Sequence, residues 1–352
     1  MLNIAYVGFG KSTNRYHLPY INIRQDKFHV SRIVTPTLNK RPEEQKYWQS
    51  AGTIFSTDLQ DILDDNSLDL VVVVTPAPQH FEIAKRLLQA GKNVLVDKPM
   101  VETPEQIREL AELAKENGLF VMPFQNRRFD SDFLTLRHVL ATGYVGRPVQ
   151  LEVHMDHYRP NPNAADSQNI MDGAWYGHGV HLVDQMFSLF GIPNSVSYDL
   201  RSTNNPRNKS EDQFDVGLFY DDNFRVTLSS SELVVSKYPK WTLHGTKGSY
   251  IKYNIDQQEY DLKAGIMPGT PGFGEDVPQD FGKLTYYNQN NDRIEKFVPT
   301  INGDYGRVYD SVFETLKNSA EKLVSDETMI SVIDLLNAGF SELSPFVWRI
   351  KE

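Results

Sequence analysis

The 352-residue sequence contains no cysteine. This absence excludes disulfide bonds, catalysis by a thiol and any metal site with cysteine ligands, and it is compatible with a reducing compartment. Long hydrophobic stretches are also missing. The longest apolar run, 70–74, is far shorter than the roughly 20 residues that a membrane-spanning helix needs. The opening segment, MLNIAYVGFG, lacks the basic and apolar regions of a signal peptide. We therefore expect a cytoplasmic protein that has no membrane partner.

Positive charge is scarce. The chain has 36 Lys and Arg residues against 46 Asp and Glu residues, which gives a formal net charge of −10. A protein that binds nucleic acid through the phosphates needs a surplus of basic residues, so we expect no nucleic-acid partner. Hydrophobic residues make up 40% of the chain, and its length is sufficient for two domains.

Strand and helix patterns alternate through residues 1–125. Residues 3–7 form a short apolar run that ends at Gly8, and 68–75, LDLVVVVT, is rich in β-branched residues that favour a strand buried on both faces. Thr103 and Gln106 have the spacing of a capping box, which marks the start of the clearest helix in the sequence. Such alternation is typical of βαβ units around a parallel sheet.

The pattern changes after residue 125. Strand-like segments then follow one another with few helices between them, which indicates an open, largely antiparallel sheet. One helix is expected at 180–190, and two more at about 304–320 and 326–342. The sequence therefore predicts an α/β protein with two domains, 1–125 and 126–352. The strands expected in the second domain are 148–158, 195–202, 214–220, 224–234, 240–245 and 249–254.

The segment GFGKST, residues 8–13, resembles two phosphate-binding loops at once. A Walker A loop needs a glycine five positions before the glycine of its Gly-Lys pair, but that position holds Ala5, inside the first strand. The dinucleotide fingerprint G-x-G-x-x-G fits better, since Gly8 permits a tight turn and Gly10 lets the backbone approach a pyrophosphate. Thr13 replaces the third glycine, which weakens the motif. Lys11, Ser12 and Thr13 would offer a charge, hydroxyls and backbone N–H groups near a helix N-terminus, which suits an anion, and Phe9 lies in the same loop.

The end of the second strand bears on the choice between NAD and NADP. An acidic residue at that point binds the ribose 2′-hydroxyl of NAD, but residues 34–37, VTPT, include none. The hydroxyls of Thr35 and Thr37, with Lys40 and Arg41 close by in the sequence, suit the 2′-phosphate of NADP. We therefore expect NADP, with NAD as the alternative cofactor.

Residues 71–99, VVVVTPAPQHFEIAKRLLQAGKNVLVDKP, resemble the central signature of the Gfo/Idh/MocA oxidoreductases, a family named for glucose–fructose oxidoreductase and inositol dehydrogenase. That signature is a strand ending in Thr-Pro, followed by a His, Ala-Gly-Lys and a Glu-Lys-Pro triplet. The similarity continues through 126–130, NRRFD, and 179–185, GVHLVDQ, and it points to the YhhX-like branch of the family. The matching residues are Thr75-Pro76, His80, Ala90-Gly91-Lys92 and Asp97-Lys98-Pro99.

This resemblance implies an N-terminal Rossmann domain with a doubly wound parallel sheet and a C-terminal α/β domain with an open sheet. It also implies hydride transfer between a nicotinamide cofactor and a small-molecule substrate, a sugar, polyol or related hydroxy/keto compound. Lys98 matches the lysine that stabilises alkoxide charge, and His181 matches the histidine that accepts the hydroxyl proton. Family members assemble through the open sheet, so we expect a homodimer or homotetramer. The residues expected to hold the cofactor are Gly8, Phe9, Gly10, Lys11, Ser12, Thr13, Thr35, Thr37, Thr75, Pro76, Ala77, His80, Asp97, Lys98 and Gln125.

The sequence departs from the family pattern at Gly177. Many members carry an Asp four positions before the catalytic histidine, where this chain has Gly177. Asp172, Asp184 or His178 could substitute for this carboxylate, or Tyr176 could be a proton donor, and the sequence does not choose among them. Without that carboxylate, a dinucleotide-binding sensor or regulatory protein is the alternative to an enzyme. Glycoside cleavage with a tightly held NAD is a third hypothesis.

Aromatic side chains of the second domain are candidates for the substrate site. Tyr158, Trp175 and Tyr176 would form a wall for a sugar ring, with His178 beside them, or would pack in the core instead.

Three arginines would either meet an acidic substrate or form ion pairs, and we favour ion pairs. They are Arg127, Arg128 and Arg159.

Four histidines raise the question of a metal site. They form the pairs His154-x-x-His157 and His178-x-x-His181. Side chains at i and i+3 point to opposite faces of a strand, so His154 and His157 should diverge. We therefore expect no metal site.

Overall fold

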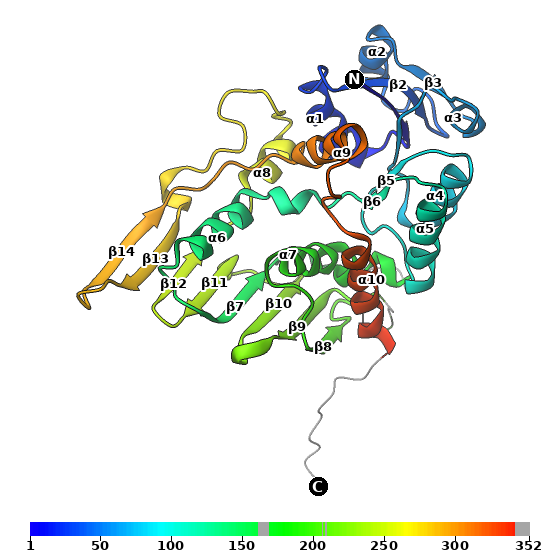
Figure 1. Cartoon of the computed structure of the whole chain (residues 1–352). Helices are drawn as coiled ribbons and strands as arrows, with labels where there is room; N and C mark the ends of the chain where they lie inside the picture. Colours follow the sequence, from blue (N-terminus) through cyan, green and yellow to red (C-terminus); the bar gives the residue numbers. More distant parts are fainter. Residues whose placement is uncertain (161–168, 206, 208–209, 342–352) are drawn as a thin grey trace. The chain divides into compact units, whose positions relative to one another are not determined.

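The computed structural model describes residues 1–160, 169–205, 207 and 210–341 (Figure 1). The chain forms two compact units. Two segments beyond residue 260 pack with the N-terminal residues. The predicted domain bounds, 1–125 and 126–352, assigned both segments to the second domain. The first unit comprises Met1–Asn126, Asp261–Phe273 and Tyr305–Ile333, and the second comprises Arg127–Tyr260, Gly274–Asp304 and the residues from Asp334 onward.

Within the described residues, the first unit holds a six-stranded sheet in the order β3-β2-β1-β4-β5-β6. All its strand pairs are parallel, and the order is that of doubly wound dinucleotide-binding folds. Every residue of the central strand β4 is buried, as expected for a strand covered on both faces. The predicted parallel sheet is confirmed. Its strands are β1 (Leu2–Val7), β2 (Phe28–Val34), β3 (Ile54–Ser56), β4 (Leu70–Val73), β5 (Val94–Val96) and β6 (Val121–Pro123).

Helices connect the strands of the first unit. The predicted capping box is present at the start of α5: the Thr103 hydroxyl accepts a hydrogen bond from the Gln106 N–H (3.3 Å), and the Gln106 side chain accepts one from the Thr103 N–H (3.2 Å). A π-helical turn, Thr13–His17, precedes α1, and Pro19 fits the first turn of α1. The α-helices between the strands are α1 (Leu18–Asn22), α2 (Pro42–Ser50), α3 (Gln60–Leu63), α4 (His80–Gln89) and α5 (Pro104–Glu116).

A helix from the end of the chain, α9 (Arg307–Asn318), packs with these N-terminal elements. The ring of Tyr309 lies edge-on to Phe28, with centroids 5.8 Å apart. Asp310 forms ion pairs with Arg24 at 2.9 Å and with Lys27 at 2.6 Å. These contacts explain why a segment far along the sequence belongs to the first unit.

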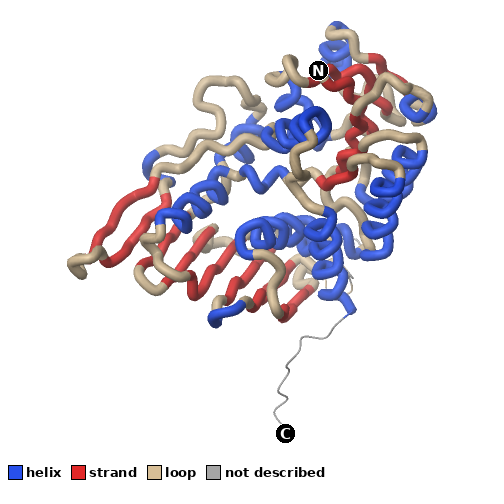
Figure 2. The backbone as a smooth tube through the Cα atoms, in the orientation of Figure 1, coloured by secondary structure: helices blue, strands red, loops and turns tan. Residues whose placement is uncertain are grey.

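Within its described residues, the second unit holds an eight-stranded sheet in the order β14-β13-β12-β11-β7-β10-β9-β8, in which β7 and β10 run parallel and the other neighbours antiparallel. The predicted, largely antiparallel sheet is confirmed. Along β7, buried Leu151 and Val153 alternate with more exposed Gln150 and Glu152. Helices α6 (Ser131–Thr142) and α7 (Val180–Phe190) cover one face of the sheet (Figure 2). The strands are β7 (Pro148–His154), β8 (Ser195–Arg201), β9 (Gln213–Phe219), β10 (Arg225–Ser231), β11 (Trp241–Gly245), β12 (Gly248–Lys252), β13 (Gly282–Tyr287) and β14 (Arg293–Val298).

The predicted helix at 180–190 is confirmed as α7 (Val180–Phe190), but α6 (Ser131–Thr142), α8 (Gln257–Ala264), β13 and β14 are elements that the sequence patterns did not predict. Residues Ser131–Leu136 of α6 are all buried although Ser131, Asp132 and Thr135 are polar, so the polar positions do not mark a solvent-exposed face as they do in an amphipathic helix. Among the described parts of the chain, no helix combines the length and apolar character needed to cross a bilayer. Helix α10 (Asp326–Ser341) comes last among the described residues.

Candidate active site

The turn after β1 has the geometry of a dinucleotide-binding loop. Gly8 adopts a φ of +110°, and a Cβ at this position would collide with the carbonyl oxygen of Val74, so only glycine fits. Gly10 differs, because a Cβ there would meet no atom within 4 Å. Packing within the protein therefore gives no reason for Gly10, whereas the close approach of a pyrophosphate to the backbone does.

Thr13 closes this loop. Its buried hydroxyl donates a hydrogen bond to the carbonyl of Gly8 (3.0 Å), and the side-chain amide of Asn14 donates one to the carbonyl of Gly10 (2.9 Å). These bonds hold the loop at the point where the third glycine of the fingerprint would allow close packing. The loop thus compensates for the substitution at Thr13. Asn14 is a loop residue that the motif did not reveal.

Other residues predicted at the cofactor follow the carboxyl ends of neighbouring parallel strands. Thr35 and Thr37 follow β2, Thr75 follows β4, and Asp97 and Lys98 follow β5. Ligands of open parallel sheets bind at this edge. The hydroxyl of Thr75 is buried and has no hydrogen-bond partner among the described residues, which leaves it for a ligand. Pro76 and Ala77 continue from Thr75, and Gln125 follows β6.

The side chains at this edge differ in their exposure. Phe9 packs edge-on against Phe55, with centroids 5.1 Å apart. Thr35 is buried, whereas Lys11 and Thr37 are exposed. Phe9 therefore shapes the loop, while Lys11 and Thr37 are accessible to a charged ligand.

Asp97 joins the loop after β1 to the end of β5. Its carboxylate accepts hydrogen bonds from the Ser12 hydroxyl (2.7 Å) and the Lys98 N–H (2.8 Å), and Nε2 of His17 lies 3.8 Å away. Burial by itself raises the pKa of Asp97, but His17, the Lys98 charge and the Ser12 hydroxyl outweigh it and hold that pKa well below its usual range. The carboxylate is therefore ionised next to Lys98.

Behind Asp97 lies a buried series of polar groups that no sequence pattern indicated. Nδ1 of His17 lies 2.7 Å from the hydroxyl of Tyr309, which lies 2.9 Å from the hydroxyl of Tyr6. Burial raises the pKa of both tyrosines, so both stay neutral. Polar contacts thus lead from the Asp97 carboxylate into the core. His17 and Tyr309 are 292 positions apart, so no local motif links them.

His80 ties two strand ends together. Its Nε2 lies 2.8 Å from the carbonyl oxygen of Thr75, and its Nδ1 lies 2.9 Å from that of Pro99. Carbonyl oxygens only accept hydrogen bonds, so a ring nitrogen of His80 that carries a hydrogen donates it to the carbonyl beside it. The side chain is buried. His80 therefore positions the segments that carry Thr75 and Lys98.

His181, the predicted general base, lies in the first turn of α7 and is buried. Asp184, on the same helix, is engaged by Arg128, whose guanidinium donates to both carboxylate oxygens at 2.7 and 2.8 Å. Burial raises the pKa of Asp184 although Arg128 lowers it. Arg127 forms ion pairs as well. The ion-pair interpretation of Arg127 and Arg128 is confirmed.

Two of the three aromatic candidates for the substrate wall are core residues. Trp175 and Tyr176 are fully buried. The indole N–H of Trp175 donates to the carbonyl of Leu336 (3.0 Å), and its ring packs on Phe214, with centroids 4.9 Å apart. Tyr158 is 59% exposed. The core-packing alternative therefore describes Trp175 and Tyr176, and Tyr158 stays a candidate for substrate contact.

The segment Trp175–Gly179 forms a π-helical turn that leads into α7. A Cβ at Gly179 would collide with the ring of Trp175, so this position requires glycine. A Cβ at Gly177 would meet no atom within 4 Å. Position 177 therefore has room for the Cβ of the aspartate that the family resemblance leads us to expect there.

Glu211, just before β9, supports this turn. Its carboxylate accepts a hydrogen bond from the N–H of Trp175, and its carbonyl accepts one from the N–H of Ala174 (2.8 Å). Burial raises the pKa of Glu211 to about 7. No sequence pattern singled out Glu211, since its partners lie more than 30 positions away.

Comparisons with known proteins agree with this geometry. Residues 2–125 match the Gfo/Idh/MocA model described as an oxidoreductase family with an NAD-binding Rossmann fold, and residues 137–344 match the model of that family's C-terminal alpha/beta domain. The chain is 46% identical to the uncharacterized oxidoreductase YhhX of Escherichia coli, over 98% of each protein. This chain belongs to the Gfo/Idh/MocA oxidoreductase family. It is an oxidoreductase with a Rossmann domain that binds a nicotinamide cofactor.

Two further members of the family are similar over nearly their whole length. IolW of Bacillus subtilis, named scyllo-inositol 2-dehydrogenase (NADP(+)), is 31% identical over 96% of this chain and 92% of IolW. A crystal structure of an oxidoreductase from Bacillus cereus has a TM-score of 0.93 and 43% identity, covering 100% of this chain and 99% of that one. The roles of individual site residues stay predictions.

Replacing Asp97 by Asn should reduce stability at neutral pH. A carboxyl group whose pKa is lower in the folded state contributes stability above its unfolded pKa, about 3.9, and loses it as the pH falls through the folded value. We expect wild type to exceed Asp97→Asn by about 1–3 kcal/mol at pH 7, and the difference to shrink below about pH 4. Urea unfolding of both proteins across this range measures it. A difference that does not vary with pH would contradict the assignment.

Replacing Glu211 by Gln should have the opposite pH signature. A buried carboxyl with a raised pKa favours folding while it is protonated, and its stability is lost as the pH rises from the unfolded value, about 4.3, to about 7. Between about pH 5 and pH 8, wild type should lose about 2–3 kcal/mol relative to Glu211→Gln. Urea unfolding measures the change, and Glu112→Gln, at an exposed position of α5, is the control. Parallel pH profiles for wild type and Glu211→Gln would refute the prediction.

Proposed function

We propose that this protein transfers a hydride between a nicotinamide cofactor, NADP in preference to NAD, and a sugar, polyol or related hydroxy/keto compound. The observation that carries the proposal is the carboxyl edge of the first sheet, where Asp97 links Ser12 of the loop after β1 to Lys98. The name of IolW, an NADP-dependent scyllo-inositol dehydrogenase, supports both the substrate class and the cofactor.

The preference for NADP rests on the end of β2. Thr35 and Thr37 stand where an acidic residue would bind the ribose of NAD, and Thr37 is exposed. Lys40 is exposed too, in the same segment. Hydroxyls and a cation suit a 2′-phosphate, whereas a carboxylate would repel it.

Oxidation of a hydroxyl group requires loss of a hydride from carbon and of a proton from oxygen. A bound nicotinamide supplies the hydride acceptor. In this proposal the Lys98 ammonium stabilises the negative charge that develops on the substrate oxygen, and His181 accepts the proton. Asp97 and His80 hold the segment that carries Lys98 through their contacts with Ser12 and Pro99.

Replacing Lys98 by Met removes the charge but keeps much of the side-chain volume. We expect the turnover number to fall by about 10²–10³-fold, as for loss of one group that stabilises an oxyanion. Turnover is followed by nicotinamide fluorescence with NADP or NAD and a panel of sugars, polyols and their keto forms. Lys115→Met, at an exposed position of α5, should behave as wild type. Full activity of Lys98→Met would exclude this role for Lys98.

Replacing Gly177 by Asp tests the departure from the family pattern. A Cβ at position 177 would meet no atom within 4 Å, and a carboxylate near a histidine base raises its effectiveness. We expect Gly177→Asp to raise the turnover number on the best polyol of the panel by at least about 10-fold. Gly177→Asn, which matches the shape without the charge, is the control and should show no such gain. A Gly177→Asp protein no faster than wild type would show that His181 needs no carboxylate at this position.

Gly177 also favours one alternative, a dinucleotide-binding sensor or regulatory protein. Such a protein binds the cofactor but turns nothing over with any member of the panel. Redox-assisted glycoside cleavage is distinguished by cofactor that copurifies with the protein and by the absence of net redox change.

We also propose a homodimer or homotetramer formed through the open face of the second sheet. Phe297 pairs with Lys283, an exposed residue between the buried Gly282 and Leu284 of β13, and Tyr253 follows the buried Lys252 at the end of β12. Tyr253 and Phe297 are 54% and 64% exposed. Exposed aromatic side chains on an uncovered sheet face support a subunit interface there.

A further inference from the structure

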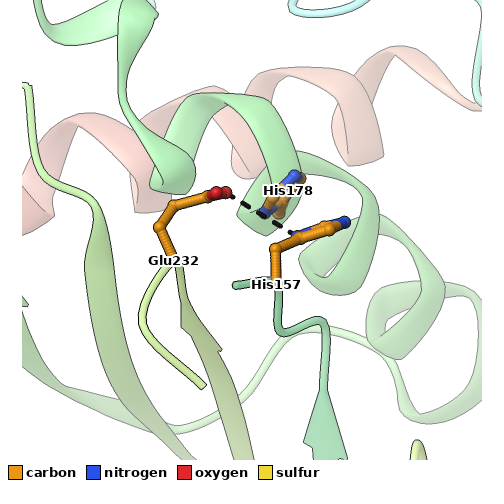
Figure 3. A group of neighbouring side chains, drawn as sticks. All are labelled: His157, His178 and Glu232. Atoms are coloured by element: carbon orange, nitrogen blue, oxygen red, sulfur yellow. Dashed lines mark ion pairs between the residues drawn. The ribbon is translucent and has the colours of Figure 1, made fainter. Parts of the chain in front are cut away.

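Three side chains from separate elements of the second unit point toward one another (Figure 3). His157 follows β7, His178 lies in the π-helical turn before α7, and Glu232 follows β10 directly. One nitrogen or oxygen atom from each lies within 4.8 Å of the others. We propose that His157, His178 and Glu232 form a binding site for a divalent transition-metal ion, with Zn²⁺ as the best match.

Backbone hydrogen bonds hold two of the proposed ligands in place. The N–H of His157 donates to the carbonyl of Ser231 (2.8 Å), and the N–H of Val234 donates to the carbonyl of His157 (2.9 Å). On the other segment, the N–H of Arg159 donates to the carbonyl of Glu232 (2.7 Å). The segments that carry His157 and Glu232 are thus paired side by side, so little conformational freedom is lost when an ion binds.

Ser230 orients the third ligand. Its hydroxyl donates to the carbonyl of Met155 (2.7 Å) and lies 3.0 Å from Nδ1 of His178. Because the hydroxyl has one proton, which goes to Met155, it accepts the second bond, and Nδ1 of His178 carries the hydrogen. A neutral ring in this tautomer has its lone pair on Nε2. Metal-binding histidines are oriented in the same way, by a hydrogen bond from the other ring nitrogen.

The distances suit a metal ion better than a direct contact. Nδ1 of His157 lies 3.7 Å from Oε1 of Glu232, which is too long for a hydrogen bond. In a tetrahedral zinc site with bonds of 2.0–2.2 Å, ligand atoms lie roughly 3.3–3.6 Å apart. The rings of His157 and His178 have centroids 5.0 Å apart and are tilted by 32°. Side-chain rotations that close the larger gaps by about 1 Å would complete the geometry.

The donor set selects the kind of ion. Two imidazoles and one carboxylate suit Zn²⁺ and neighbouring first-row metals, whereas Ca²⁺ and Mg²⁺ prefer oxygen ligands. Three protein ligands leave a coordination position for water or a substrate oxygen. The side chains of His157 and Glu232 are 22% and 17% exposed, so an ion can reach them. Arg159 lies 3.6 Å from Glu232, but its side chain is 58% exposed and can turn into solvent.

The prediction of no metal site rested on the divergence of His154 and His157 along a strand. His154 does diverge from His157: it lies 3.0 Å from Asp156 and stacks on Tyr238. The proposed site takes one histidine from each pair and adds Glu232. The site contains neither Lys98 nor His181, so metal binding does not depend on the proposed hydride transfer.

Zinc binding by the full-length protein tests the proposal. After treatment with a chelator, the protein is titrated with ZnCl₂ by calorimetry, and bound zinc is measured by atomic emission after dialysis. We expect one tightly bound Zn²⁺ per chain. Ser230→Ala should weaken binding about 10–100-fold, as for the loss of an orienting partner. His157→Gln and Glu232→Gln should weaken it further than that.

His244→Gln is the matched control, because His244 is an exposed histidine of β11 that bonds only to Ser249 among the contacts described for it; it should bind zinc as wild type does. Circular dichroism checks the fold of each variant, and Co²⁺ gives a second readout through the visible absorption of imidazole-ligated cobalt in wild type. The proposal is overturned if wild type binds no zinc and gives no cobalt spectrum. Equal affinities for wild type, His157→Gln and Glu232→Gln would also overturn it.

Discussion

The ionised carboxylate of Asp97 organises the carboxyl edge of the first sheet. It accepts hydrogen bonds from Ser12 in the loop after β1 and from the N–H of Lys98 after β5, so one buried charge fixes two strand ends. Behind it, His17 and Tyr309 extend the polar contacts to a helix from the end of the chain. A buried anion is tolerable only where such partners surround it. The phosphate-binding loop and the proposed catalytic lysine therefore share one support.

In the second unit, burial of Trp175 has a similar organising effect. The ring of Trp175 requires glycine at position 179, and the backbone N–H of Trp175 donates a hydrogen bond to the carboxylate of Glu211. The resulting π-helical turn carries Gly177 and His178 and leads directly to His181 on α7. Packing around Trp175 thus helps to position His181, the proposed proton acceptor, and His178, a proposed metal ligand. Neither role is visible from the helix pattern alone.

Features carried by neighbouring residues could be predicted from the sequence. The glycines at 8 and 10, the β-branched strand β4 and the capping box at Thr103 depend on spacings of a few positions, and all three are present. Features that depend on distant residues could not be predicted. Tyr309 beside His17, Glu211 beneath Trp175, and Glu232 facing His157 become neighbours only after folding. Helix α6 was not predicted for another reason. Its first turns are buried on nearly all sides, so the residues do not show the apolar and polar periodicity of an amphipathic helix.

The central claim is that the ends of β1, β2, β4 and β5 bind a nicotinamide dinucleotide, with NADP preferred. Titrating the full-length protein with NADPH and with NADH, while following nicotinamide fluorescence, tests this claim directly. We predict saturable binding of both nucleotides, with the lower Kd for NADPH because no carboxylate follows β2. Tighter binding of NADH would contradict the interpretation of Thr35 and Thr37. Failure to bind either nucleotide would contradict the account as a whole.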